Sequence, residues 1–153
     1  ATLYEIGLIE ALKTGGYNFL DPNSVQSAAE MDKIAHQALS ADYFLMSANA
    51  ITESGELVNA DGYGNRISAL IFGPQNVIVI AGLNKVEPDI NSAIQRVKKH
   101  AARMILLKFN KDYNSLDEID KAAEDAVSQL VITSKTTTKG RIKVIIVGED
   151  LGF

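Results

Sequence analysis

The chain has 153 residues, 46% of them hydrophobic and 22% charged, which is typical of one folded domain rather than of a disordered chain. Its net charge of −4 gives no long-range attraction to nucleic acid or anionic membrane, no apolar run is long enough to span a bilayer, and no signal-peptide pattern opens the sequence. Cysteine is absent, which excludes disulfides and thiolate-held metal or iron–sulfur sites within the chain and suits the cytoplasmic location that we expect.

The first third of the chain predicts two helices and two short strands. Apolar residues at helical spacing begin at Leu3 and stop before Gly15, a residue type that often ends helices. Asp21 and Pro22 close the first strand, and Ser24 is placed to cap the second helix. The expected elements are helices over residues 2–13 and 24–41 and strands over residues 17–21 and 42–48.

A turn, a short helix and a β-branched strand follow. Apolar and polar residues alternate on both sides of Ser54-Gly55, which is typical of a β-hairpin or of a looser excursion of the chain. Asn65 is a suitable N-cap for "NRISALIF", and Gly73-Pro74 ends that helix. The expected elements are a hairpin over residues 51–60, a helix over 65–72 and a strand over 77–82.

The last part of the chain contains the clearest helix. Pro88 lies in its expected first turn, with acidic residues at its start and basic residues at its end. Ser115 and Glu118 have capping-box spacing at the start of another helix. The expected elements are helices over residues 87–103 and 115–129 and strands over 105–110, 130–134 and 141–149.

Several of these strands are unbroken apolar runs, and helices fall between most of them. Strands of this kind are covered on both faces. The pattern predicts a three-layer α/β fold with a largely parallel sheet and helices on both faces, forming a single domain over residues 1–153. A doubly wound sheet normally leads into its first helix from a strand, so we also expect an upstream segment that this sequence does not contain.

The loop from Asp61 to Arg66 combines features of an anion-binding site. Gly62 and Gly64 allow positive φ and close approach to the backbone. A helix that starts at Asn65 directs its first amides toward the loop, and Arg66 can add a bidentate contact to a carboxylate or phosphate. The spacing matches neither the dinucleotide fingerprint nor the phosphate-binding P-loop. The structural alternative is a tight strand-to-helix turn capped by Asn65.

Further polar residues follow other predicted strands. Ligand sites in open α/β sheets lie beyond the carboxyl ends of the strands. We therefore expect these residues to lie near the Asp61–Arg66 loop and to contribute to binding or catalysis. They are Asn49, Asn84, Lys85, Glu149 and Asp150.

Each candidate also has a structural interpretation. Asp61 is equally suited to accept hydrogen bonds from turn amides, and Lys85 to be a solvated loop lysine. Glu149 and Asp150 suit a role in holding the end of the chain or in facing a dimer partner. His100, near the end of an amphipathic helix, suits a cationic or capping role.

Three segments of the sequence resemble a known family. The longest is "NAITESGELVNADGYGNRISALIFGPQNVIVIAGLNKV", and the ending "RIKVIIVGEDLGF" is the second. Both closely resemble the LUD-domain family, the lactate-utilisation proteins. The opening "TLYEIGLIEAL" looks like the family's first helix, which normally follows a Gly-Gly-Ser type loop. The resemblance covers most of the chain, and the missing loop agrees with the upstream segment that we expect.

The resemblance implies a fold similar to that of ribose-phosphate isomerases, CoA transferases and formyltetrahydrofolate cyclo-ligase. Those relatives bind phosphorylated or carboxylated small molecules at the carboxyl ends of their strands. Some LUD proteins are subunits of a bacterial system that oxidises L-lactate to pyruvate, and others have no assigned activity. The resemblance thus implies a small anionic metabolite as the ligand.

The resemblance also bears on cofactors and partners. Many relatives carry a cysteine-containing segment before the last two strands, whereas residues 108–129 here contain no cysteine. We therefore expect no cofactor on this chain, and any iron–sulfur cofactor would lie on a partner subunit. Exposed edges of the sheet need cover, so we expect a homodimer.

Two classes of function follow. In the first, the protein is an enzyme or enzyme subunit in which Arg66, Lys85 and the Gly62–Asn65 amides hold a carboxylate or phosphate. Asp61 or Glu149 then serves as base, provided that burial or a neighbouring acid raises its pKa. In the second, the protein is a non-catalytic accessory or regulatory subunit that senses a ligand. A sugar-phosphate or acyl-CoA isomerase or transferase is a further alternative, and the acidic balance disfavours nucleic-acid binding.

Overall fold

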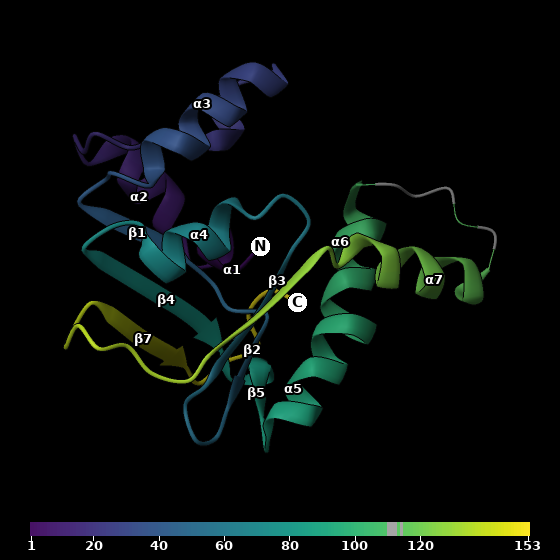
Figure 1. Cartoon of the computed structure of the whole chain (residues 1–153). Coiled ribbons are helices and arrows are strands. Elements are labelled where there is room, and N and C mark those ends of the chain that lie inside the picture. The colour runs from purple at the N-terminus through teal and green to yellow at the C-terminus, as the bar shows by residue number, and fades with distance from the viewer. Residues whose placement is uncertain (110–112, 114) are drawn as a thin grey trace.

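The computed structural model describes residues 1–109, 113 and 115–153, and its strands form two sheets (Figure 1). The first sheet is entirely parallel, whereas the second pairs β2 with β5 in parallel and β3 with β2 and β6 antiparallel. The first sheet has the order β1 (Tyr43–Met46), β4 (Asn76–Gly82), β7 (Ile142–Val147). The second has the order β5 (Val86–Glu87), β2 (Ala50–Thr52), β3 (Leu57–Asp61), β6 (Gln129–Thr133).

Helices surround both sheets, which confirms the expected α/β class (Figure 1). The α-helices are α1 (Thr2–Glu5), α2 (Leu8–Thr14), α3 (Ala28–Ala38), α4 (Asn65–Phe72), α5 (Ile90–Arg96), α6 (Ala102–Phe109) and α7 (Leu116–Ala126). Short 3₁₀ turns cover Pro22–Ser24 and Leu83–Lys85, and a π-helical segment, Val97–Ala101, joins α5 to α6.

Two apolar cores hold these layers together. One lies where α4 and both sheets meet, and the other lies between the second sheet and α5 with its π-helical extension. Burial of aliphatic side chains on this scale is the main stabilising contribution to such a fold. The first core contains Met46, Ala48, Ile51, Leu57, Leu70, Val77, Val79 and Ala81. The second contains Ala50, Val58, Ala60, Ala93 and Val97.

The strands predicted from the sequence divide between two sheets instead of extending one. The hairpin predicted over residues 51–60 is confirmed as β2 and β3. Because β6 then pairs antiparallel with β3, these strands build a mixed sheet of their own. The last two predicted strands, β6 and β7, consequently lie in different sheets.

Two predictions near the start of the chain are wrong. The helix expected over residues 2–13 is interrupted at Gly7, whose φ of 72° is left-handed and breaks the helical path. Residues 17–21 form no strand. The side chain of Asp21 instead accepts from the backbone amide of Asn23, at the start of a 3₁₀ turn, and pairs with Lys13 at 2.9 Å.

The strand expected over residues 105–110 is also wrong where the structure describes it. Residues 102–109 form α6, which continues the helix through the π-helical segment, and Asn110 lies outside the described residues. A short apolar run does not distinguish a buried helix from a strand by periodicity alone.

The helix caps agree with the sequence in part. Ser115 caps α7 by accepting from the amide of Glu118 at 3.2 Å, as predicted. The cap of α3 is Ser27 rather than Ser24. Helix α5 begins at Ile90, after Pro88, because Asp89 accepts from an amide of its first turn.

The outer strand β7 leaves apolar surface uncovered. Val144, Ile145 and Ile146 are 42–49% exposed, so both faces of this strand carry accessible aliphatic side chains. None of the helices that the structure describes is both long enough and apolar enough to cross a membrane.

Candidate functional site

The end of the chain lies against the carboxyl end of β4. Leu83 donates its amide to the carbonyl of Glu149 at 2.9 Å, and the amide of Leu151 donates to Asn84 Oδ1 at 3.1 Å. Gly82 permits this approach, because a Cβ at that position would collide with the backbone of Glu149 and Leu151. Residues that follow β4 and β7 are thereby brought together.

Arg96, on α5, is held beneath this junction by backbone carbonyls. Its Nε donates to the carbonyl of Asn84 at 3.1 Å, and its Nη1 donates to the carbonyl of Asn49 at 2.6 Å. Arg96 also forms an ion pair with Glu87, whose Oε1 lies 3.7 Å from Nε. The Arg96 side chain is only 7% exposed, and burial lowers its pKa from the usual value. A guanidinium so fixed is pre-organised to meet an anion.

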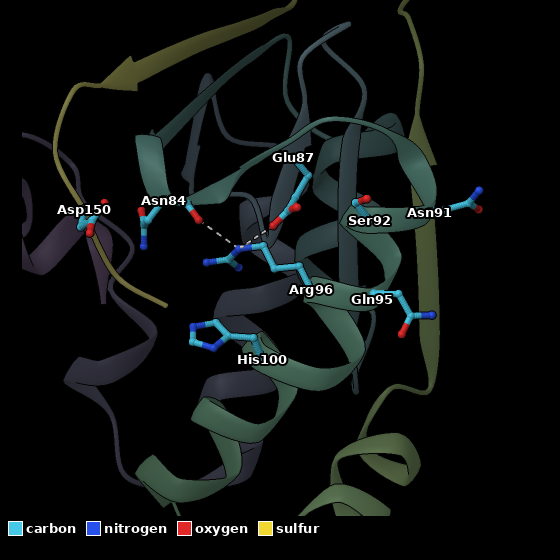
Figure 2. Close-up of a pocket in the computed structure, with 8 residues that line it drawn as sticks. All are labelled: Asn84, Glu87, Asn91, Ser92, Gln95, Arg96, His100 and Asp150. Atoms are coloured by element: carbon cyan, nitrogen blue, oxygen red, sulfur yellow. Dashed lines mark hydrogen bonds and ion pairs between the residues drawn. The ribbon is translucent and has the colours of Figure 1, made fainter.

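An open pocket of about 810 Å³ lies over Arg96, and we call it the Arg96 pocket. Figure 2 shows Arg96 and His100 reaching from the same helical segment toward Asn84 and Asp150. Burial and the charges of Arg96 and Arg103 lower the pKa of His100, which favours its neutral form at neutral pH. The lining residues are Asn84, Glu87, Asn91, Ser92, Gln95, Arg96, His100 and Asp150.

Lys85 is buried, with 3% of its surface exposed, so its interpretation as a solvated loop lysine is wrong. Its Nζ donates to the hydroxyl oxygens of Thr2 and Ser47, each at 3.0 Å. Burial, reinforced by the charges of Arg96 and Arg66, lowers the pKa of Lys85 from 10.5 to about 8. The ammonium of Lys85 therefore lies within electrostatic reach of two other cations.

The Asp61–Arg66 loop binds its own side chains. Asp61 Oδ2 accepts from the backbone amide of Arg66 at 3.0 Å, as the structural interpretation of Asp61 anticipated. The guanidinium of Arg66 donates to the carbonyl of Ala60 at 2.7 Å and lies 3.6 Å from Asp61 Oδ1. The prediction of Asn65 as N-cap is wrong, because Gly64, with φ of 91°, occupies that position.

A second, smaller depression of about 320 Å³ lies beside this loop, between α3 and the start of α4. The phenol of Tyr63 donates to Asp32 of α3 across it. Gly64 is buried and its φ of 91° favours glycine, whereas Gly62 is exposed. The residues that line the depression are Ala35, His36, Leu39, Tyr63, Gly64, Asn65 and Ser68.

Asn49 connects the two regions through hydrogen bonds. Its carbonyl accepts from Arg96, and its Oδ1 accepts from the amide of Ala60, whose carbonyl binds Arg66. Asn49 also donates its amide to Asn59 Oδ1 at 3.2 Å. Both asparagines are buried, and Asn59 Nδ2 has no hydrogen-bond partner within the described residues. The two arginines are thus positioned by one continuous polar network.

The structure gathers part of the predicted set. Arg96 is surrounded by three of the predicted residues, Asn49, Asn84 and Asp150. Lys85 follows Asn84 directly in the sequence. The Asp61–Arg66 loop borders the separate depression described above. Glu149 is exposed and is not part of the lining of the Arg96 pocket.

Sequence reasoning missed Arg96, Glu87 and Ser47. The spacing of Arg96 and His100 was an available signal, because residues four apart lie on one face of a helix. By its position alone, Arg96 is one of several basic residues near the end of the predicted helix. Nothing in the local sequence indicates that Ser47 meets Lys85, since 38 residues separate them.

Comparison with known proteins gives one match. The family model described as LUD domain matches residues 1–147. No curated protein and no solved structure gave a match. Among the residues that the structure describes, no group of three or more histidine, aspartate or glutamate side chains is placed to hold a metal ion.

Proposed function

This chain belongs to the LUD-domain family, and from that premise we propose that it binds a small carboxylated or phosphorylated metabolite in the Arg96 pocket. The family is of the lactate-utilisation type. The proposed role is that of a cytoplasmic subunit or relative of the bacterial system that oxidises L-lactate to pyruvate. Any iron–sulfur cofactor of that system would lie on a partner subunit, because this chain contains no cysteine.

The observation that carries the proposal is the pair of buried cations at the carboxyl end of β4. Burial lowers the pKa of both side chains, and the charge of Arg96 lowers the pKa of Lys85 further. Glu5 acts in the opposite direction on Lys85, and Glu87 does so on Arg96. Burying like charges near one another costs free energy, and a bound anion offsets that cost. His100 and Asn84 add hydrogen-bonding groups on the open side of the same pocket.

One observation favours the non-catalytic alternative, a ligand-sensing accessory subunit. The two proposed bases, Asp61 and Glu149, do not line the Arg96 pocket. Asp61 is occupied by the amide and guanidinium of Arg66, and Glu149 is exposed. Catalysis by either carboxylate stays a prediction, and a binding role needs neither.

A thermal-shift panel tests the binding proposal. The panel contains L-lactate, pyruvate, inorganic phosphate, ribose 5-phosphate and acetyl-coenzyme A. A ligand present at about one hundred times its Kd should raise Tm by roughly 5–10 °C for a domain of this size. We expect His100→Ala to reduce the shift at fixed ligand concentration by about half, because it removes a group that lines the pocket.

His36→Ala is the matched control, since His36 lines the depression beside α4 instead. We expect it to leave the ligand-induced shift unchanged. If His36→Ala abolishes the shift and His100→Ala does not, the ligand binds at the start of α4 and the Arg96 pocket is the wrong site.

We also propose a homodimer, supported by the exposed aliphatic side chains of β7. A second copy would cover apolar surface and the unpaired edge of the strand. Light scattering at micromolar concentration should give the mass of two chains, and Ile145→Lys should reduce it to one. A single-chain mass for the unaltered protein at high concentration contradicts this proposal.

A further inference from the structure

Lys85 and Ser47 make a contact that the binding proposal does not use. Lys85 Nζ lies 3.0 Å from Ser47 Oγ and 3.0 Å from Thr2 Oγ1, so both of its partners are neutral hydroxyl groups. Within residues 1–109, 113 and 115–153, no carboxylate forms an ion pair with Lys85. Buried lysines are normally paired with acids, so this environment disfavours the charged form of the amine.

The two residues occupy the position where α/β sheets carry their active sites. Ser47 directly follows β1, and Lys85 lies in the turn after β4, the neighbouring parallel strand. Both therefore lie at the carboxyl edge of the first sheet. Ser47 is half-buried rather than enclosed, and it also donates a long hydrogen bond of 3.4 Å to the carbonyl of Ala48.

From this geometry we propose that Ser47 and Lys85 form a serine–lysine dyad that cleaves an ester or thioester. A serine hydroxyl needs an adjacent base to act as a nucleophile, and a neutral lysine amine at hydrogen-bonding distance supplies one. Burial lowers the pKa of Lys85 to about 8, so a usable fraction of the amine is neutral near physiological pH. Thr2 fixes the direction of the amine from its other side.

The reaction proceeds in two balanced steps. Ser47 Oγ bonds to the acyl carbon as its proton passes to Lys85 Nζ, and the bond from that carbon to the leaving oxygen or sulfur breaks. The leaving alcohol or thiol takes the proton from Lys85. Water then attacks the acyl-serine, Lys85 accepts the proton of that water, and Ser47 recovers it as the carboxylic acid departs.

A purely structural role for this contact makes different predictions. If the hydroxyls serve only to satisfy the buried amine, Ser47 has ordinary serine reactivity. It would then react no faster than an exposed serine such as Ser40.

The test is covalent labelling of the full chain with a small alkyl fluorophosphonate, followed by peptide mapping. We expect stoichiometric labelling at Ser47, faster at pH 9 than at pH 6 because more of Lys85 is neutral. Ser47→Ala should abolish the labelling, and Lys85→Met should slow the labelling of Ser47 at least 100-fold. The control variants Ser40→Ala and Lys33→Met change exposed residues, and Ser47 should be labelled in them at the rate of the unaltered protein.

Circular dichroism and Tm measured on each variant separate loss of reactivity from loss of fold. If Lys85→Met unfolds, Lys85→Arg replaces it in the experiment. Arginine keeps the charge but is not a base at this pH, so the labelling of Ser47 should again be at least 100-fold slower. Labelling that is absent from Ser47 in the folded, unaltered protein overturns the dyad. Equal labelling rates with and without Lys85 overturn it as well.

A second arm compares p-nitrophenyl acetate with the monoanionic p-nitrophenyl succinate. A preference for the anionic ester rests on the proposed function, because its carboxylate would bind in the Arg96 pocket. We expect the anionic ester to acylate Ser47 at least tenfold faster. If both esters acylate Ser47 equally, the dyad holds and the proposed anion site fails, so the two failures are distinguishable.

Discussion

Replacing Lys85 by methionine should stabilise the protein at pH 7 and destabilise it at pH 11. The folded state lowers the pKa of this lysine from 10.5 to about 8, chiefly through burial. Below pH 8 both states are protonated, and keeping the charge buried costs the folded state about 3 kcal/mol. Between pH 8 and 10.5 the unfolded state binds more protons than the folded state, so stability rises with pH across that interval.

Methionine removes the buried charge and also the two hydrogen bonds to Thr2 and Ser47. Each neutral hydrogen bond contributes about 1 kcal/mol. The variant should therefore be more stable than the unaltered protein by about 1 kcal/mol at pH 7 and less stable by about 2 kcal/mol at pH 11. Urea unfolding at both pH values measures the difference.

Lys33→Met is the control, because Lys33 is exposed on α3 and its replacement should change stability by less than about 0.5 kcal/mol. A difference for Lys85→Met that stays constant from pH 7 to pH 11 would show that Lys85 titrates alike in the folded and unfolded states. In that case Lys85 would be neither a cation destabilised by burial nor a neutral amine near pH 8.

Replacing Arg141 by alanine should lower the free energy of unfolding by about 3 kcal/mol. Its guanidinium donates to the carbonyls of Ala69, Leu70 and Pro74 at 2.9, 2.6 and 3.0 Å, respectively. These carbonyls belong to the last turn of α4 and the turn that follows. Carbonyls at the end of a helix commonly lack partners within the helix, although that of Ala69 also accepts from the Gly73 amide. Arg141 thus attaches α4 to the start of β7.

Arg141→Lys separates charge from geometry, since a single ammonium cannot reach three carbonyls as the planar guanidinium does. We expect the lysine variant to recover less than half of the loss, measured by urea unfolding. A loss below 1 kcal/mol for Arg141→Ala would mean that the apolar core around Leu70 holds α4 by itself.

The sequence predicted those features of the fold that depend on local pattern. The hairpin over residues 51–60 and the helix over 65–72 are set by turn residues and short-range periodicity, and both are confirmed. The short apolar run at residues 105–109 fits a helix or a strand equally well by pattern. Packing against α7 and the π-helical segment makes it a helix, so the prediction of a strand was wrong. The division into two sheets likewise depends on long-range pairing of β6 with β3.

The candidate site could be predicted only in part for the same reason. Strand ends locate Asn49, Asn84 and Lys85, because the carboxyl edge of a parallel sheet gathers whatever follows its strands. Burial of Lys85 and its contact with Ser47 arise from tertiary packing that no local pattern encodes. Likewise, the sequence suggested both an anion site and a turn at residues 61–66, and the internal bond from Asp61 to the Arg66 amide supports the turn.

Arginine Nε–H signals in ¹H–¹⁵N spectra report whether an anion binds over the Arg96 guanidinium. The signal of Arg96, assigned by its loss in Arg96→Lys, should move in a saturable way as the metabolite with the largest thermal shift is added. The signal of Arg141, assigned likewise, should stay in place. Saturable movement of the Arg66 signal while that of Arg96 remains fixed would place the ligand at the start of α4 and rule out the Arg96 pocket as the binding site.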